Sequence, residues 1–170
     1  MNLKDYIATV HDFPIEGIVF RDITPLMADG EAFGEACNQM KEFAKSVGAT
    51  LVAGPESRGF IFGCPVAKDM EIGFVPVRKP NKLPRKTVSI KYDLEYGSNE
   101  LHMHADAVKK GDKVIIIDDL LATGGTLEAA VKLIKRCGAE VVGIGCVIEL
   151  VDLNGKEKLN NVNIECLISY

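Results

Sequence analysis

The sequence contains no apolar run close to the roughly 20 residues that a helix needs to span a bilayer. Residues 1–10 include Lys4 and Asp5 and lack the apolar segment of a signal peptide. The 5 cysteines are odd in number and show no Cys-x-x-Cys spacing, so neither a disulfide framework nor a zinc site is expected. These absences predict a cytoplasmic protein with reduced, mostly buried thiols and no membrane partner.

The sequence also has no excess of positive charge. Lysine and arginine total 20 and aspartate and glutamate total 24, which gives a net charge of −4. This balance argues against general binding to nucleic acid, because such binding normally needs clustered cations. No internal repeat, low-complexity stretch or linker divides the 170 residues, so we expect one domain with a full hydrophobic core.

Strand and helix patterns alternate along most of the chain. Apolar spacing predicts helices over residues 3–10, 31–47 and 59–70 and from Thr126 onward. Strands or extended pieces are predicted over residues 15–20, 51–54, 72–77, 87–92, 100–104, 114–117, 140–149 and 162–169. This alternation indicates an α/β fold with a parallel sheet and right-handed crossovers.

The most informative stretch runs from Val114 to Thr126. Four consecutive β-branched aliphatic residues predict a strand that is buried on both faces. Asp118 and Asp119 follow where this strand is expected to end, and a loop with two adjacent glycines leads to the helical pattern at Thr126. A strand, a small-residue loop and a helix N-terminus suit phosphate, because free backbone N–H groups and the helix dipole face the anion.

The loop lacks the signatures of two common nucleotide sites. It has no lysine of the kind that a Walker A loop requires, and Gly124-Gly125 does not form Gly-x-Gly-x-x-Gly. The acidic pair instead suits a vicinal diol, because carboxylates accept hydrogen bonds from hydroxyl groups. The stretch therefore predicts a ribose phosphate ligand; a plain strand-to-helix turn with solvated aspartates is the alternative.

Residues 114–126 strongly resemble the PRPP-binding motif of the type I phosphoribosyltransferases, where PRPP is 5-phosphoribosyl-1-pyrophosphate. The resemblance implies that Asp118 and Asp119 hold the ribose hydroxyls. It implies that the 5-phosphate lies on a loop formed by Ala122, Thr123, Gly124, Gly125 and Thr126. It also implies the fold of that family: a central, mostly parallel sheet flanked by helices, a hood contributed by about residues 1–30, and a flexible basic loop.

A second loop carries a candidate anion contact. Residues 53–59 read Ala-Gly-Pro-Glu-Ser-Arg-Gly and lie between a predicted strand and a predicted helix. Arg58 offers a bidentate guanidinium to pyrophosphate, although such residues are also common in ordinary turns. In the phosphoribosyltransferases this loop receives the pyrophosphate, often through a cis peptide, which is here expected between Glu56 and Ser57.

The segment from about residue 78 to 100 is the expected basic loop. Its cations are Arg78, Lys79, Lys82, Arg85, Lys86 and Lys91. Pro80 and Pro84 exclude a regular helix. We interpret the segment as a mobile lid over pyrophosphate that excludes water, with a solvated surface loop as the alternative. The predicted pyrophosphate contacts are Glu56, Ser57, Arg58, Arg78, Lys79 and Lys82.

Two further groups are assigned to the purine base. Adenine presents an N6 donor and an N1 acceptor, so a backbone C=O beside an N–H selects it, and an apolar side chain can stack on the ring. We predict that Val19, Phe20 and Arg21 form this site, with core packing as the alternative for Phe20. Glu95 is the candidate catalytic residue, because a carboxylate near N7 can hold or donate a proton; an exposed loop glutamate is the alternative.

Five motifs in one order extend the resemblance over essentially the whole chain. They are Phe-Arg-Asp-Ile-Thr-Pro, Gly-Pro-Glu-Ser-Arg-Gly-Phe, Val-Arg-Lys-Pro-Asn-Lys-Leu-Pro, Leu-Glu-Tyr-Gly and Asp-Asp-Leu-Leu-Ala-Thr-Gly-Gly-Thr. This order is similar to that of the adenine-specific members of the family. The similarity implies purine salvage, in which adenine and PRPP give AMP and pyrophosphate. It also implies a homodimer and Mg²⁺ that is held mainly by PRPP, with no direct protein ligand.

Several alternatives and two unassigned motifs remain. The alternatives are a transferase for another purine base, a PRPP-sensing regulator without catalysis, and a generic phosphate-binding α/β domain. His102 and His104 alternate onto one face of an expected strand, and we favour a surface pair because no third metal ligand accompanies them. Gly155-Lys156-Glu157-Lys158 resembles a late segment of the family, but no role follows from its sequence.

Overall fold

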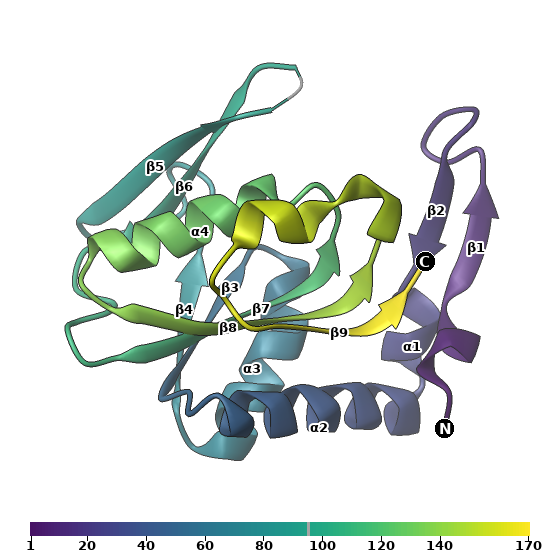
Figure 1. The fold of residues 1–170 in the computed structure, drawn as a ribbon, viewed down its shortest axis with the longest axis horizontal. Helices are drawn as coiled ribbons and strands as arrows, with labels where there is room; N and C mark the ends of the chain where they lie inside the picture. The colour runs from purple at the N-terminus through teal and green to yellow at the C-terminus, as the bar shows by residue number, and fades with distance from the viewer. Residues whose placement is uncertain (95) are drawn as a thin grey trace.

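The computed structural model describes residues 1–94 and 96–170, and its centre is a five-stranded parallel sheet in the order β4-β3-β7-β8-β9 (Figure 1). The strands are β3 (Leu51–Pro55), β4 (Gly73–Val77), β7 (Lys113–Leu121), β8 (Glu140–Glu149) and β9 (Ile164–Ser169). Every neighbouring pair in this sheet is parallel. The predicted parallel α/β sheet is therefore confirmed.

Helices cover both faces of the sheet (Figure 1). On one face lie α2 (Gly30–Ser46) and α3 (Arg58–Met70), and on the other lies α4 (Gly125–Arg136). Ile115 and Ile117 of β7 pack toward α2 and α3, whereas Val114 and Ile116 pack toward α4. All four side chains are completely buried, as a strand covered on both faces requires.

The helix boundaries follow local signals in the sequence. The Asp29 carboxylate accepts a hydrogen bond of 2.9 Å from the Ala32 N–H and so caps α2. The α3 helix continues through Pro65 and ends at Met70, because the next residue, Glu71, has a left-handed φ of 56°. Both helices lie within one residue of the predicted ranges. No helix in residues 1–94 and 96–170 is both long and apolar enough to cross a bilayer.

Three expectations about local structure were wrong. The extended piece predicted over residues 15–20 is a turn up to Gly17, closed by a hydrogen bond of 3.3 Å from the Ile18 N–H to the Ile15 carbonyl oxygen, and β2 begins only at Val19. The central strand does not end at Asp118 and Asp119 but continues to Leu121, because β8 pairs with it as far as Glu149. Residues 3–10 do not form one helix. They form the short 3₁₀ helix η1 (Leu3–Tyr6) and then enter β1 (Ala8–His11), because pairing with a second strand takes over.

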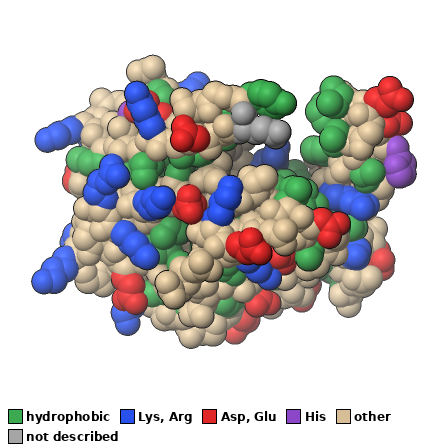
Figure 2. Space-filling view, turned by 45° about the horizontal axis from the view of Figure 1, so that its top comes forward, with side chains coloured by type: hydrophobic (Ala, Val, Ile, Leu, Met, Phe, Trp, Pro, Cys, Tyr) green, Lys and Arg blue, Asp and Glu red, His purple; other side chains and the backbone are tan. Residues whose placement is uncertain are grey.

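The N-terminal part forms a separate lobe, which we call the hood. Its β1 strand pairs antiparallel with β2 (Val19–Asp22), and the short α1 helix (Thr24–Ala28) leads back to the body. Figure 2 shows the hood divided from the rest of the molecule by a hollow, with apolar side chains facing that hollow. Phe13, Ile15, Ile18 and Val19 are all exposed.

A second antiparallel hairpin stands at the opposite end of the molecule (Figure 1). It consists of β5 (Thr87–Asp93) and β6 (Ser98–His104), and it packs its inner face against α4. His102 contacts Thr87 Oγ1 at 3.0 Å through Nδ1 and Glu100 Oε1 at 2.9 Å through Nε2. This histidine is therefore part of a local polar network within the hairpin.

Two remaining features concern the thiols and the late segment. Cys37 and Cys146 are buried and Cys64 is exposed, so the expectation of mostly buried thiols holds only in part, because α3 turns Cys64 toward solvent.

After β8 the chain forms the 3₁₀ helices η2 (Val151–Leu153) and η3 (Gly155–Leu159) before entering β9. This segment crosses the carboxyl end of the sheet beside the N-terminus of α4 (Figure 1).

Candidate active site

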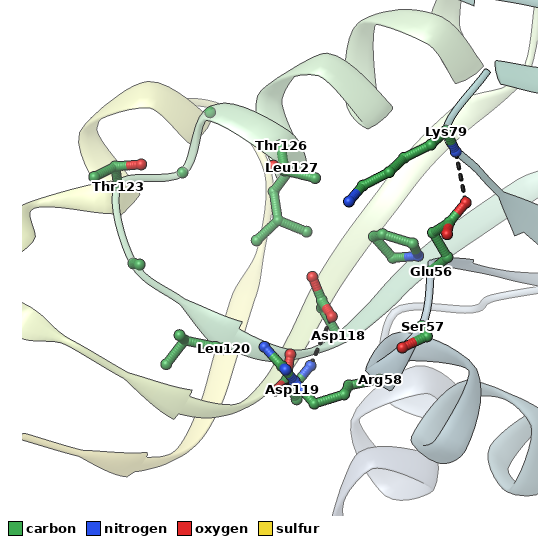
Figure 3. A pocket seen from close by; sticks show the side chains of 14 residues that line it. Glu56, Ser57, Arg58, Lys79, Asp118, Asp119, Leu120, Thr123, Thr126 and Leu127 are labelled. Atoms are coloured by element: carbon green, nitrogen blue, oxygen red, sulfur yellow. Dashed lines mark hydrogen bonds and ion pairs between the residues drawn. The ribbon is translucent and has the colours of Figure 1, made fainter. Parts of the chain in front are cut away.

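The strand order creates a crevice at the carboxyl ends of β3 and β7. The chain leaves β3 toward β4 on one side and leaves β7 toward β8 on the other, so the two following loops diverge. A cavity of about 400 Å³ opens between them, which we call the polar pocket (Figure 3). It is lined by Pro55–Arg58, Lys79, Asp118–Leu120 and Ala122–Leu127.

The loop between β7 and α4 presents the start of a helix to the polar pocket. Gly124 has a φ of +85°, a left-handed conformation that glycine adopts at little cost. The α4 helix begins at the next residue, and no side chain in the described part of the chain caps it. The first N–H groups of α4 therefore remain available to an anion, as the sequence predicted.

Asp118 and Asp119 lie on the floor of this pocket. Asp119 is buried, and its carboxylate accepts a hydrogen bond from Arg58 Nε within an ion pair. The Asp119 N–H donates to Asp118 Oδ1 at 2.9 Å. Burial and the neighbouring Asp119 carboxylate together raise the pKa of Asp118 well above its usual range. The acidic pair is thus two unequal groups, one neutralised by arginine and one facing the pocket without a cation of its own.

A glycine explains why Arg58 comes so close to the acidic pair. A Cβ atom on Gly59 would lie 2.8 Å from the Ile117 carbonyl oxygen and 3.2 Å from Asp118 Oδ1. Only glycine lets the first turn of α3 approach the end of β7 at this distance. The Arg58 side chain is then held over Asp119 instead of extending freely into the pocket (Figure 3).

The loop after β3 holds the cationic segment in place. The peptide between Glu56 and Ser57 is cis, as the family resemblance implied. Glu56 Oε1 accepts a hydrogen bond of 2.6 Å from the Lys79 N–H and lies 3.3 Å from Arg78 Nε. The Glu56 carboxylate therefore faces the Arg78 guanidinium and the backbone of Lys79, and the Lys79 ammonium extends into the pocket (Figure 3).

A second cavity of about 590 Å³ lies between the hood and the body, and we call it the apolar pocket. Val19, Phe20 and Arg21 line it together with apolar side chains of β8 and the hood. The Phe13 ring meets the Phe20 ring edge to face at 5.1 Å. Arg58, Asp119 and Leu120 line both pockets and form a wall between them. Molecules bound in the two pockets would therefore meet at this wall.

An apolar pocket that meets a polar pocket at Arg58 and Asp119 suits a flat base linked to a sugar phosphate. Residues 35–167 match a model of the family described as "Phosphoribosyl transferase domain". The chain is 55% identical to adenine phosphoribosyltransferase of Lactobacillus gasseri over 170 residues, which cover 100% of this chain and 97% of that protein. The chain belongs to the adenine phosphoribosyltransferase family.

Solved structures agree with this assignment. The crystal structure of adenine phosphoribosyltransferase from Thermoanaerobacter pseudethanolicus superimposes with a TM-score of 0.94 at 45% identity, covering 99% of this chain and 98% of that one. The enzyme from Giardia lamblia, solved with 9-deazaadenine, superimposes with a TM-score of 0.92 at 33% identity, covering 100% and 98%. The predicted type I phosphoribosyltransferase fold is confirmed.

The structure brings together many of the residues that the sequence predicted for this phosphoribosyltransferase. The polar pocket contains Asp118, Asp119, Glu56–Arg58, Lys79 and the whole loop from Ala122 to Thr126. Arg78 and Lys82 lie outside the lining of this pocket, Arg78 beside Glu56 and Lys82 exposed. Glu95, the predicted catalytic residue, lies outside the residues that the structure describes.

Two tyrosines beside residues that line the two pockets were missed from the sequence. The Tyr92 hydroxyl from β5 lies 3.1 Å from Thr126 Oγ1, so the β5-β6 hairpin touches the start of α4. Tyr170, directly after β9, packs its ring 4.0 Å from the Arg21 guanidinium. Arg21 Nη1 also donates to Thr9 Oγ1 at 2.7 Å. No local pattern marks either tyrosine, because each contact joins segments that are far apart in the chain.

Proposed function

We propose that this enzyme transfers the 5-phosphoribosyl group from PRPP to adenine, giving AMP and pyrophosphate, as a step of purine salvage. The observation that carries the proposal is the wall of Arg58, Asp119 and Leu120 that the polar and apolar pockets share. A base in one pocket and a phosphoribosyl group in the other would meet at this wall. The Giardia relative solved with 9-deazaadenine supports an adenine-like base.

The phosphoribosyl half of the reaction is assigned to the polar pocket. The N–H groups from Ala122 to Thr126 hold the 5-phosphate, and Asp118 and Asp119 accept hydrogen bonds from the ribose hydroxyls. Lys79 and Arg58 neutralise pyrophosphate as its bond to the anomeric carbon breaks, with Arg78 and Lys82 contributing from the lid. Glu56 and Ser57 shape this subsite through the backbone, since the Glu56 carboxylate already faces Arg78 and the Lys79 N–H.

The base half is assigned to the hood. Val19 and Phe20 supply an apolar face, and the backbone near Arg21 reads the adenine edge. The Arg21 side chain is already bonded to Thr9 and packed on Tyr170, which supports a role for its peptide group and not for its guanidinium. Adenine N9 then attacks the anomeric carbon, which develops oxocarbenium character as pyrophosphate leaves.

The lid contributes water exclusion and a proton acceptor. Residues 78–100 close over pyrophosphate, and Glu95 takes up the proton from N7 of the purine as N9 bonds to the anomeric carbon, returning it to N7 in the reverse direction. The Glu95→Gln variant is expected to lower kcat while leaving the KM values for adenine and PRPP near those of wild type. An unchanged kcat would remove Glu95 from the proposed chemistry.

The donors present fit Mg²⁺ that arrives on PRPP. In the described residues no cluster of three or more His, Cys, Asp or Glu side chains is arranged to hold a metal ion. The Asp118 and Asp119 carboxylates line the pocket, and their negative charge would favour Mg²⁺ that PRPP itself holds, without direct coordination by the protein. Bound Mg²⁺ would neutralise charge on the departing pyrophosphate.

We also propose a cytoplasmic homodimer. The five free thiols support a reducing compartment, and the family resemblance supports the dimer. The chain acts as one domain over residues 1–170, with the hood over about residues 1–30 and the lid over about residues 78–100.

One assay tests the proposed function. Purified protein is incubated with PRPP, Mg²⁺ and adenine, hypoxanthine or guanine, and pyrophosphate release is measured together with the nucleotide formed. We expect AMP and pyrophosphate in equal amounts from adenine, and much slower release with the other bases. Faster release with another purine would reassign the base, and PRPP binding without release would favour the sensing regulator.

A further inference from the structure

The motif Gly155-Lys156-Glu157-Lys158 lies directly behind the phosphate loop. Gly155 begins η3 and is buried, although Lys156 to Lys158 are exposed. A Cβ atom on Gly155 would overlap the Ala122 carbonyl oxygen and lie 2.8 Å from Leu121 Cδ1. The backbone of η3 therefore touches the backbone of the loop with no room for a side chain between them.

The contact is reciprocal. A Cβ atom on Gly124 would lie 2.6 Å from the Gly155 carbonyl oxygen. Gly124 and Gly155 thus face each other, and each leaves the space that the other's backbone occupies. Because Gly124 also holds the left-handed conformation that starts α4, a shift of η3 would change the directions of the loop N–H groups.

Two anchors fix η3 in this position. Lys156 Nζ lies 2.9 Å from Glu149 Oε2, and the Glu149 side chain is only 11% exposed. The hydrogen bond to Glu149 raises the pKa of Lys156, so the lysine stays charged in this pair. Glu149 pairs in the sheet with Leu121, the last residue of β7 before the loop. Leu159 is buried and packs into the core beside α4, which holds the other end of η3.

These contacts connect β7, β8, η3 and the loop before α4 in a closed ring. The end of β7 carries the loop, β8 lies beside it, Glu149 holds Lys156, and Gly155 meets Ala122 and Gly124. We propose that Gly155, Lys156 and Leu159 form a clamp that sets the shape of the phosphate loop, and that Lys156 is a positioning residue for the 5-phosphate of the substrate. The inference rests on the proposed function, because it takes the loop as the 5-phosphate site.

The proposal predicts that loss of the clamp weakens the binding of PRPP and leaves the binding of adenine almost unchanged. Convergent N–H groups bind an anion well only when their directions are fixed in advance. Lys156→Met keeps the apolar stem but releases Glu149, and it is expected to raise the KM for PRPP about tenfold, equivalent to about 1.4 kcal/mol. The KM for adenine and kcat at saturating PRPP should change less than about twofold, since neither depends on this loop.

Direct titration separates the clamp from the reaction. The Kd of ribose 5-phosphate is measured calorimetrically for wild type, Lys156→Met, Lys156→Arg and the matched control Lys158→Met, a neighbouring lysine that is exposed. Lys156→Met should bind about tenfold more weakly, Lys156→Arg should recover most of the affinity, and Lys158→Met should match wild type. If wild type binds ribose 5-phosphate but releases no pyrophosphate, the proposed function fails while the clamp is still tested.

Two outcomes would overturn the clamp. One is an unchanged Kd and KM for PRPP in Lys156→Met, and the other is an equal loss in Lys158→Met. A merely structural role would lower Tm and the active fraction, and hence kcat, while leaving the KM for PRPP unchanged, which would also count against the proposal. Gly155→Ala gives a second test: folded protein with wild-type affinity for ribose 5-phosphate would contradict the glycine contact.

Discussion

The polar pocket and the apolar pocket are built in opposite ways. The polar pocket lies at the end of strands that are buried on both faces, and Asp119 in its floor is only 8% exposed. The apolar pocket is roofed by a two-stranded hairpin whose Phe13, Ile18 and Val19 are 49%, 44% and 45% exposed. An isolated two-stranded hairpin is marginally stable, so the hood depends on its contacts with the body.

This difference matches what the two halves of the proposed reaction need. A phosphoribosyl group is charged, and stabilising its charge requires donors and acceptors that do not move during the reaction. A purine ring is flat and largely apolar, and the apolar side chains of the hood offer it a surface to pack against. Activity should therefore be sensitive to single changes of charge in the polar pocket and to loss of apolar contacts in the hood.

The largest expected effect on activity comes from a substitution in the polar pocket. Asp119→Asn removes a charge that Arg58 pairs with and that we assign to the ribose hydroxyls. We expect kcat/KM for PRPP to fall about 100-fold, near 2.7 kcal/mol, because hydrogen bonds to charged groups are among the strong ones. Steady-state kinetics would check this, with the exposed Glu140→Gln at the opposite end of the sheet as the control. A loss below threefold would contradict the assignment of Asp119.

Phe20→Ala tests the hood and is expected to have the next largest effect. Its ring lines the apolar pocket and packs against Phe13 at 5.1 Å, so its removal takes away a stacking surface for the base. We expect the KM for adenine to rise about tenfold and the KM for PRPP to change less than about twofold. Phe20→Leu should show a smaller rise. An equal rise for PRPP would mean that the pockets do not act separately.

The Asp118→Asn substitution tests the polar pocket through its effect on the stability of the folded protein. Because the folded-state pKa of Asp118 is raised, the folded protein binds a proton more tightly than the unfolded chain, and stability falls as pH rises from about 4 through that pKa. At pH 7.5, which is above the ordinary pKa of an aspartate, keeping the Asp118 carboxyl buried beside Asp119 therefore costs stability. We expect Asp118→Asn to raise Tm by about 3 °C there, the response of a domain this size to about 1 kcal/mol, while weakening PRPP binding.

Thermal unfolding of wild type and Asp118→Asn across pH would test the sign. The difference in Tm should shrink as the pH is lowered through the raised pKa of the folded carboxyl toward 4, where the carboxyl of the unfolded chain takes up its proton as well. A variant less stable than wild type at pH 7.5 would mean that the charged form is stabilised by its surroundings, contrary to the pKa direction.

The smallest predicted effect concerns the attachment of the hood. Tyr170→Ala removes the ring that packs 4.0 Å from the Arg21 guanidinium, a contact worth about 0.5–1 kcal/mol when partly exposed. We expect the KM for adenine to rise about threefold, with recovery in Tyr170→Phe because the ring is retained. The KM for PRPP serves as the internal control. Equal rises for both substrates would place Tyr170 in general stability and not in the hood.

Much of the rigid pocket was predictable because its parts are contiguous. The run from Val114 to Ile117, the acidic pair and the glycines that open α4 appear within one short stretch, and each implies its own local structure. The hood was harder, because Phe20 reads equally well as a core residue. The end of β7 was misplaced for a related reason: its extension to Leu121 depends on pairing with β8, which no pattern within the strand reveals.

The sequence by itself predicted the parallel α/β architecture, a loop suited to phosphate and a ribose phosphate as its ligand, because period, spacing and residue chemistry act over a few neighbouring positions. Only the tertiary structure decided that Arg58 pairs with Asp119, that Tyr170 holds Arg21, and that Gly155 backs Gly124. Each of these contacts joins residues dozens of positions apart, or more. Their geometry follows from sheet order and close packing, which are properties of the whole folded chain.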